Sequence, residues 1–307
     1  MRNKRILITG GTGFLGSRLA LAFAPHNTVM VLGRSGKAPS RKIKFIKADV
    51  RSKRFVSILA TEKFDFIFHL AGNVDVGLSF LRPEYDLEEN ILPTLRMLEF
   101  IKEKNLKTKF VYASSAAVYG ACKDNKLSEE KSVPIPISNY GVSKLAAEHY
   151  VHSFAKQYGV RAISLRIFSL YGPGQQRQIV FDFIRKLKAN PVTLEIIGDG
   201  KQARDLVFVG DQVDNMLRIA EEAVYAGEVY NMGSSKLYTT IQIAKAVALA
   251  MDLSPRFIFS GSKRRFDGQR WLADNRKIRA LGCKFKTSFK DGVRETVLWY
   301  EAHGAKK

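Results

Sequence analysis

The chain has 307 residues, 46% hydrophobic and 26% charged, which is typical of a globular protein and unlike a disordered one. Its formal net charge of +21 favours anionic partners, namely nucleic acids, membrane surfaces or phosphorylated small molecules, without choosing among them. The two cysteines, Cys122 and Cys283, lie far apart, which argues against a disulfide framework or a zinc site, and no apolar run reaches the roughly 20 residues that span a bilayer.

Short apolar runs alternate with helix-period segments along the first half of the chain. The runs cover residues 6–8, 28–32, 45–46, 64–70, 110–112 and 162–165, and the helical segments include 85–104 and 140–158. Strands buried on both faces of a parallel sheet have this continuous apolar character. The sequence therefore predicts an α/β fold with a doubly wound parallel sheet of the Rossmann type over residues 1–170. After Gly172-Pro173-Gly174 the pattern is less regular, which predicts a second, smaller α/β substrate lobe over residues 171–307.

A glycine-rich turn follows the first predicted strand and opens a helix. Glycines at positions 10, 13 and 16 permit a tight turn, a close approach of backbone amides to a pyrophosphate, and close helix packing. The turn predicts a dinucleotide site, and its expected cofactor-binding residues are Gly10, Thr12, Gly13, Phe14, Leu15 and Gly16.

The ends of the second and third predicted strands bear on the choice of dinucleotide. The second strand ends in Gly33-Arg34-Ser35, where a fold specific for NAD commonly carries an acidic residue for the ribose hydroxyls. Arg34, with Ser35, suits the 2′-phosphate of NADP through charge-assisted hydrogen bonds. We therefore expect NADP as the preferred cofactor, with NAD as the alternative, and Asp49-Val50 as the contact for the adenine.

A candidate catalytic group follows from the spacing of three polar residues. Tyr140 and Lys144 stand at i and i+4, on one face of a predicted helix. Ser115 ends the apolar strand that precedes this helix, 25 residues upstream of Tyr140. Lys144 and an oxidised nicotinamide are both positive, so they would stabilise the phenolate of Tyr140 and let it exchange a proton.

These motifs resemble the extended short-chain dehydrogenase/reductases, the NAD(P)-dependent nucleotide-sugar epimerase/dehydratase family. The chain carries T-G-G-x-G-x-x-G from Thr9, H-L-A from His69, S-S-x-x-V-Y-G from Ser114 and Y-x-x-x-K from Tyr140. The resemblance implies that Lys144 also holds the nicotinamide ribose, while Ser115 orients the reacting oxygen. It adds Leu70, Ala71, Gly72, Asn90 and Ala113 to the expected cofactor site.

The resemblance also bears on the second half of the chain. Residues near 205–235 resemble the segment that returns to the first domain, which would make the substrate lobe discontinuous. The family usually has asparagine where this chain has Ser169, and the stretch containing Arg204 is similar to one that grips a nucleotide diphosphate. Guanidinium groups suit phosphate oxygens, so we expect the substrate at Ser115, Ser169, Arg204, Arg265 and Arg270.

Several reactions remain open within this family. Dehydratases carry T-D-E before V-Y-G, and the chain has Ser115-Ala116-Ala117 there, which argues against water elimination. We expect a 4-ketoreductase that transfers a hydride from NADPH to C4 of a nucleotide-linked sugar, because Arg34 replaces the acid. The alternatives are a C4 epimerase with tightly bound NAD and, from another class, a redox-inactive NADP-binding interaction protein.

The expected partners follow from the same features. The resemblance implies a nucleotide-sugar substrate and a homodimer packed through the helices at 85–104 and 140–158. No recognised module supports binding of nucleic acid, and no ligand spacing supports a metal. The charged start, Met1 to Arg5, precedes an apolar run that glycines soon interrupt, so we expect a cytoplasmic protein without integral membrane contact.

Overall fold

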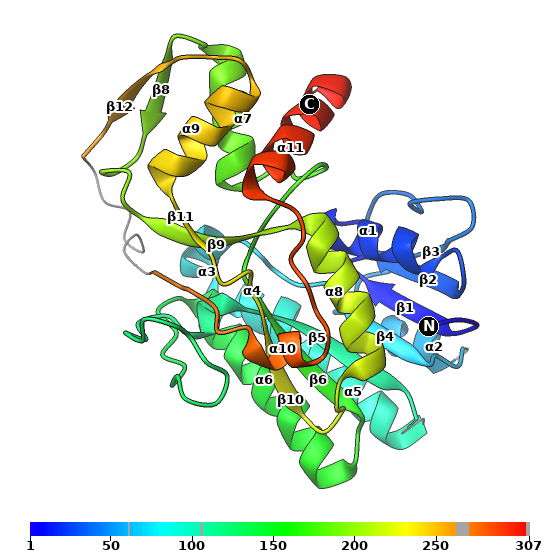
Figure 1. The fold of residues 1–307 in the computed structure, drawn as a ribbon. Coiled ribbons are helices and arrows are strands. Elements are labelled where there is room, and N and C mark those ends of the chain that lie inside the picture. The colour runs from blue at the N-terminus through cyan, green and yellow to red at the C-terminus, as the bar shows by residue number, and fades with distance from the viewer. Residues whose placement is uncertain (61, 105–106, 262–269, 305–307) are drawn as a thin grey trace.

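The computed structural model describes residues 1–60, 62–104, 107–261 and 270–304, and its centre is a seven-stranded parallel sheet (Figure 1). The strand order is β10-β6-β5-β4-β1-β2-β3, with β1 paired in parallel to both β2 and β4. The bounds are β1 Arg5–Thr9, β2 Thr28–Gly33, β3 Lys44–Lys47, β4 Phe66–His69, β5 Lys109–Ser115, β6 Ala162–Ile167 and β10 Glu228–Met232. The predicted doubly wound α/β fold is confirmed.

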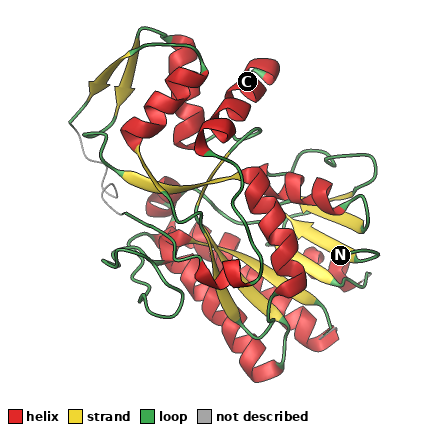
Figure 2. Cartoon of the chain, viewed as in Figure 1, coloured by secondary structure: helices red, strands yellow, loops and turns green. Residues whose placement is uncertain are grey.

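Helices cover both faces of this sheet, as the alternation of red helices and yellow strands shows (Figure 2). In β1, Ile6 and Ile8 pack with helices α1 (Phe14–Phe23) and α8 (Val209–Glu222). Leu7 points to the other face and packs with α2 (Lys53–Ala60), α5 (Leu92–Lys104) and α6 (Asn139–Tyr158). Successive strand side chains face opposite ways, so a strand covered on both sides must be apolar throughout. Each such burial contributes about 1.5–3 kcal/mol.

The segment predicted as one helix over 85–104 is divided in the structure. It consists of α4 (Pro83–Asp86), the π-helical turn η1 (Leu87–Ile91) and α5. The amide of Leu92 donates to the carbonyl of Leu87, five residues back, and Pro93 follows without an amide hydrogen. The missing donor of Pro93 interrupts the regular hydrogen-bond ladder, and the extra residue of the π turn changes which side chains face inward.

Helix α6 is well defined at both ends. The side chain of Ser138 caps its first turn by accepting from the amide of Gly141 at 3.0 Å. Gly159 ends it with a positive φ of 70°, the left-handed conformation that glycine adopts at low cost. Between these caps the helix places Tyr140 and Lys144 beside the end of β5, while the short helical turn η2 (Ala116–Val118) continues from that strand.

The second lobe contains two small sheets and several helices. One sheet has the order β11-β9-β7, with β7 parallel and β11 antiparallel to β9, and the other pairs β12 with β8. Its packed core includes residues from α7, α9 and α11. The remaining bounds are α3 Val76–Leu81, β7 Ser169–Tyr171, α7 Gln178–Ala189, β8 Thr193–Ile196, β9 Ala203–Phe208, β11 Leu237–Thr239, α9 Thr240–Ala250, β12 Arg256–Phe259, α10 Arg276–Ala280 and α11 Phe289–His303.

The chain passes more than once between the part that contains the seven-stranded sheet and the second lobe. Strand β10 comes from the second half of the sequence yet forms the edge of the large sheet beside β6, and α8 covers the same sheet (Figure 1). The division at residues 170 and 171 stays a prediction. Within the described part of the chain, no helix has the length and apolar character needed to cross a bilayer.

Candidate active site

A cavity of about 860 Å³ lies along the C-terminal ends of the parallel strands. Its walls include the residues just after β1, β2, β3 and β4, the end of β5, and residues of the second lobe. In open α/β sheets, ligands bind in the crevice outside these strand ends. The volume is typical of small-molecule and cofactor sites.

The glycine loop forms one wall of this cavity. Gly10 has a φ of 68°, and a Cβ added to Gly16 would stand 2.3 Å from the carbonyl oxygen of Gly10, so a side chain there would break the turn. Gly13 precedes α1, where no side chain of the described residues caps the helix and the first turn is without acidic residues. A Cβ on Gly13 would meet only the Gly10 oxygen, at 3.1 Å. The loop therefore leaves open space beside a positive helix end, which fits a pyrophosphate.

Tyr140, Lys144 and Ser115 all line this same cavity. The hydroxyl of Ser115 interacts with the phenol of Tyr140 closely enough to lower the pKa of that phenol. The ammonium of Lys144 donates to the carbonyl oxygen of Ala113 at 3.0 Å and lies 5.9 Å from the centre of the Tyr140 ring. The structure thus brings together the three side chains whose spacing marked them in the sequence.

Burial shifts both titratable groups of this trio. It raises the pKa of the Tyr140 phenol, an effect that the interaction with Ser115 opposes and the charge of Asp86 supports. It lowers the pKa of Lys144 to about 8, against the opposing influence of Asp86 and Glu148. At neutral pH the lysine is therefore mostly charged, and the phenol needs a further positive charge beside it to ionise.

Buried polar groups connect these residues to the elements behind them. Asn90 of η1 donates to the hydroxyl of Ser143 in α6 at 2.9 Å, and Asp86 accepts from the amide nitrogen of Asn73 at 2.7 Å. Burial raises the pKa of Asp86. These contacts fix η1 against the helix that carries Tyr140 and Lys144.

A buried ion pair lies one helical turn beyond Lys144. Glu148 of α6 accepts three hydrogen bonds, at 2.9, 2.9 and 3.2 Å, from Arg166 of β6 and a fourth, at 2.7 Å, from the hydroxyl of Ser114. Both charged side chains are almost fully buried. The pair joins α6, β5 and β6 immediately behind the catalytic candidates.

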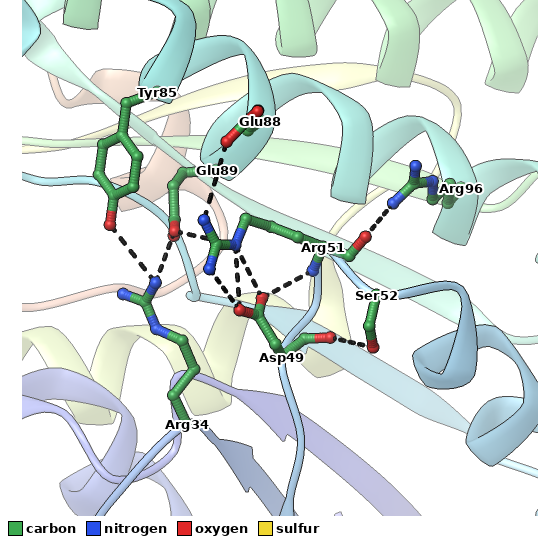
Figure 3. Close-up of polar contacts among 8 residues, drawn as sticks. All are labelled: Arg34, Asp49, Arg51, Ser52, Tyr85, Glu88, Glu89 and Arg96. Carbon is green, nitrogen blue, oxygen red and sulfur yellow. Dashed lines mark hydrogen bonds and ion pairs between the residues drawn. The ribbon is translucent and has the colours of Figure 1, made fainter. Parts of the chain in front are cut away.

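The other end of the cavity carries a cluster of charged side chains (Figure 3). Arg34, just after β2, donates to the carboxylate of Glu89 in η1 at 2.6 Å, and both residues line the cavity. Arg51 lies 3.4 Å from the same carboxylate oxygen. It also donates to Asp49 at 2.6 Å. Every one of these carboxylates thus has an arginine partner.

The second lobe contributes the rest of the wall. Ser169 and Arg204 line the cavity, and the substrate contacts expected for them stay predictions. Asp205 also faces it, with a pKa raised by burial to about 6, and its oxygens accept hydrogen bonds from Ser234, Ser235 and Ala273. Sequence analysis missed several lining residues, namely Glu89, Gln175, Arg177, Gln178, Asp205 and Trp271.

Most of the predicted site residues share this one cavity, and a few do not. Asp49 is held by Arg51, and Asn90 is fully buried beside Ser143, so neither is among the described lining residues. Arg270 is exposed and is also outside that set, whereas Arg265 lies outside the described residues. The predicted residues that do line the cavity are Gly10, Thr12, Gly13, Phe14, Leu15, Gly16, Arg34, Ser35, Val50, Leu70, Ala71, Gly72, Ala113, Ser115, Tyr140, Lys144, Ser169 and Arg204.

Comparison with known proteins agrees with this arrangement. The chain is 32% identical over 313 residues to a Bacillus subtilis protein described as an uncharacterized UDP-glucose epimerase, YtcB, with 96% of this chain and 97% of the relative covered. Among solved structures, a UDP-N-acetylglucosamine 4-epimerase from Methanobrevibacter ruminantium M1, in complex with UDP-N-acetylmuramic acid, has a TM-score of 0.90 at 28% identity and covers 98% and 99% of the two chains.

A second solved structure, MoeE5 in complex with UDP-glucuronic acid and NAD, has a TM-score of 0.88 at 29% identity and covers 97% and 99% of the two chains. Residues 6–233 match the family described as the NAD dependent epimerase/dehydratase family. The predicted family is therefore confirmed: this protein belongs to the NAD dependent epimerase/dehydratase family and is an enzyme of the extended short-chain dehydrogenase/reductase type.

Proposed function

We propose that this enzyme is a nucleotide-sugar 4-epimerase that works with NAD. The observation that carries the proposal is that Tyr140, Lys144 and Ser115 line the same cavity as the glycine loop and Arg204. The relatives at this level of similarity include a UDP-glucose epimerase and a UDP-N-acetylglucosamine 4-epimerase. We expect the substrate of this enzyme to be a sugar nucleotide similar to those named for these relatives.

Tyr140 is the proposed acid and base. It would take the proton from a sugar hydroxyl and return it, while Ser115, which interacts with the phenol, would orient the same oxygen. Lys144, held by the carbonyl of Ala113, would favour the phenolate by its charge. The dinucleotide, when bound, would supply the exchange of the hydride.

The dinucleotide would lie on residues that already shape the cavity. The glycine loop would hold the pyrophosphate on the N-terminus of α1, and Val50, Leu70, Ala71, Gly72 and Ala113 would line the rest. The sequence favoured NADP because of Arg34, but Arg34 is engaged by Glu89 at 2.6 Å. That ion pair, together with a neighbour that binds NAD, supports NAD here.

The substrate would approach from the second lobe. Arg177 and Arg204 line that part of the cavity and carry the charge that a nucleotide diphosphate requires. A dehydratase would need a carboxylic acid beside Tyr140. Among the described lining residues the carboxylates are Glu89, paired with Arg34, and Asp205, whose oxygens are already hydrogen-bonded. This arrangement disfavours water elimination.

A 4-ketoreductase is the second candidate, because the cation Arg34 stands where an acid is common in NAD enzymes. The two functions differ in what they consume. A reductase needs a stoichiometric supply of NADPH and a 4-keto sugar, whereas an epimerase interconverts two sugars without net oxidation.

We also propose the homodimer that the family resemblance implies. Two exposed apolar side chains on α6 support it, Val142 at 51% and Tyr150 at 40% of their full exposure. Both lie on the helix predicted to pack against a second copy, and sedimentation of the purified protein would measure the assembly directly.

The test is to incubate purified protein with UDP-glucose, UDP-N-acetylglucosamine or UDP-glucuronic acid and to follow the C4 epimer by proton NMR. We expect interconversion with NAD and no consumption of NADPH. The variant Tyr140→Phe should lower the rate by about 10²–10⁴-fold, while Tyr158→Phe, at an exposed tyrosine on the same helix, should leave it unchanged. Net consumption of NADPH with a 4-keto sugar, without epimer formation, would favour the reductase.

A further inference from the structure

The charged cluster at the end of the cavity away from Tyr140 contains a carboxylate that does not come from the end of β2. The position after β2 lacks an acid, yet a carboxylate reaches the same place from η1, because Glu89 lies 2.6 Å from Arg34. Figure 3 shows the two side chains pointing toward each other from separate elements. The acid is therefore present in space although it is absent from the expected position in the sequence.

Glu89 is held firmly in this place. Its side chain is only 3% exposed, and the residue that follows it, Asn90, is fully buried and hydrogen-bonded to α6. Arg51 approaches the same oxygen at 3.4 Å and is itself fixed by Asp49 at 2.6 Å. Moving the carboxylate away would require a change in η1, which is packed against the catalytic helix.

Arg34 is the more exposed partner, with 51% of its side chain accessible to solvent. The nitrogen that donates to Glu89 also lies 3.4 Å from the hydroxyl of Tyr85. The cavity wall at this end thus presents an ion pair with little net charge, in place of a free guanidinium.

We propose that Glu89, paired with Arg34, selects NAD over NADP by accepting hydrogen bonds from the adenosine ribose and excluding a 2′-phosphate. The inference rests on the proposed use of a dinucleotide in this cavity. Ribose hydroxyls donate well to a carboxylate, which is why acids mark NAD sites. The 2′-phosphate of NADP carries about two negative charges, which the buried carboxylate of Glu89 would repel. The two anions would also compete for the guanidinium of Arg34.

The experiment is titration calorimetry of NAD⁺ and NADP⁺ with the full-length wild type and three variants. The wild type should bind NAD⁺ at least about tenfold more tightly than NADP⁺. Glu89→Gln, which removes the charge and keeps the shape, should reduce that ratio by about tenfold or more, chiefly through tighter NADP⁺ binding. Glu89→Asp keeps the charge and should keep a preference for NAD⁺.

Glu88→Gln is the matched control. Glu88 precedes Glu89 in η1 and lies 3.7 Å from Arg51, but it is 55% exposed and is not among the described lining residues. Its variant removes the same charge from the same cluster and should shift the ratio by a few-fold at most. A thermal melt with each dinucleotide gives the same comparison for any variant that is only marginally folded.

Three results would overturn the inference: a wild type that prefers NADP⁺, equal effects of Glu88→Gln and Glu89→Gln, or equal effects of Glu89→Asp and Glu89→Gln. The proposed function fails separately. If selectivity follows Glu89 but no sugar nucleotide is epimerised, only the function is wrong. If epimerisation occurs without a preference between the dinucleotides, only the role of Glu89 is wrong.

Discussion

The two ends of the cavity hold their charges in different ways. At the catalytic end, Lys144 and the Glu148–Arg166 pair are almost fully buried. Lys144 donates to a backbone carbonyl, and the pair is completed by the hydroxyl of Ser114. At the other end Glu89 is buried as well, but its partner Arg34 and its neighbour Glu88 are about half exposed, and the contacts join side chains of an ionic cluster (Figure 3). Water screens exposed charges but not buried ones.

This difference separates two kinds of consequence. A buried charge changes stability and chemistry together, because removing its partner leaves an uncompensated charge in a medium that solvates it poorly. An exposed charge adds little to stability and acts mainly on the ligands that approach it. Variants at the catalytic end should therefore change stability and rate together, whereas variants of exposed charges at the other end should change mainly ligand binding.

The largest effect is expected from Lys144→Met. The variant removes the cation that favours the phenolate of Tyr140 but keeps a long apolar side chain in the buried site. The rate of epimerisation should fall by about 10²–10⁴-fold. The control is Lys156→Met, an exposed lysine on the same helix, which should retain the wild-type rate. Rates within a few-fold of each other for the two variants would contradict the role given to Lys144.

The next largest effect is on stability, and it is seen by comparing one carboxylate from each end of the cavity. Glu148→Gln would leave Arg166 buried without its counter-charge, and should lower the free energy of unfolding by about 3–5 kcal/mol. Glu88→Gln removes an exposed partner of Arg51 and should cost less than about 1 kcal/mol. Urea unfolding of both variants measures the two values. Similar losses would mean that burial does not separate the two ends.

The catalytic end could be predicted from the sequence because its information is local. Tyr140 and Lys144 stand one helical turn apart, and Ser115 ends the strand that the helix packs beside. The glycine loop is also contiguous. In each case regular secondary structure converts sequence spacing into spatial contact, so neighbours in the pattern are neighbours in the fold.

The far end depends on a contact between residues 55 positions apart, Arg34 and Glu89. The acid that contacts the ribose in NAD sites is expected at the end of β2, because such residues are common there. The π turn that places Glu89 arises beside Pro93, and a regular helix over 85–104 was expected instead. The sequence shows the proline, but not the direction in which the interrupted turn aims its side chains.

Residues of the second lobe were predicted least completely. Arg177, Gln178 and Trp271 line the cavity without any motif to mark them, and Gln178 adopts a positive φ of 71°. Their positions follow from how small sheets pack on the large domain, which depends on contacts across the whole chain. Arg204 lines the cavity too, and its expected role, which came from a stretch similar to one in the family, stays a prediction.

The smallest predicted effect is a dependence of stability on pH that belongs to the buried end alone. Lys144 has a pKa of about 8 in the folded protein, against an ordinary value of 10.5, because burial disfavours its charge. As pH rises from about 8 to 10.5, the folded protein releases this proton while the unfolded chain still holds it. The unfolded state then binds more protons, so the lysine's contribution to the free energy of unfolding increases with pH.

The comparison of wild type with Lys144→Met isolates this contribution. At pH 7 the folded wild type carries the cost of a buried charge, so the methionine variant should be the more stable of the two. The gap should shrink by up to about 3 kcal/mol as pH approaches 10.5. Urea unfolding of both proteins across pH 7 to 10 measures it. A gap that stays constant or widens would mean that Lys144 is better solvated than its burial indicates, and the contrast between the two ends would then lose its physical basis.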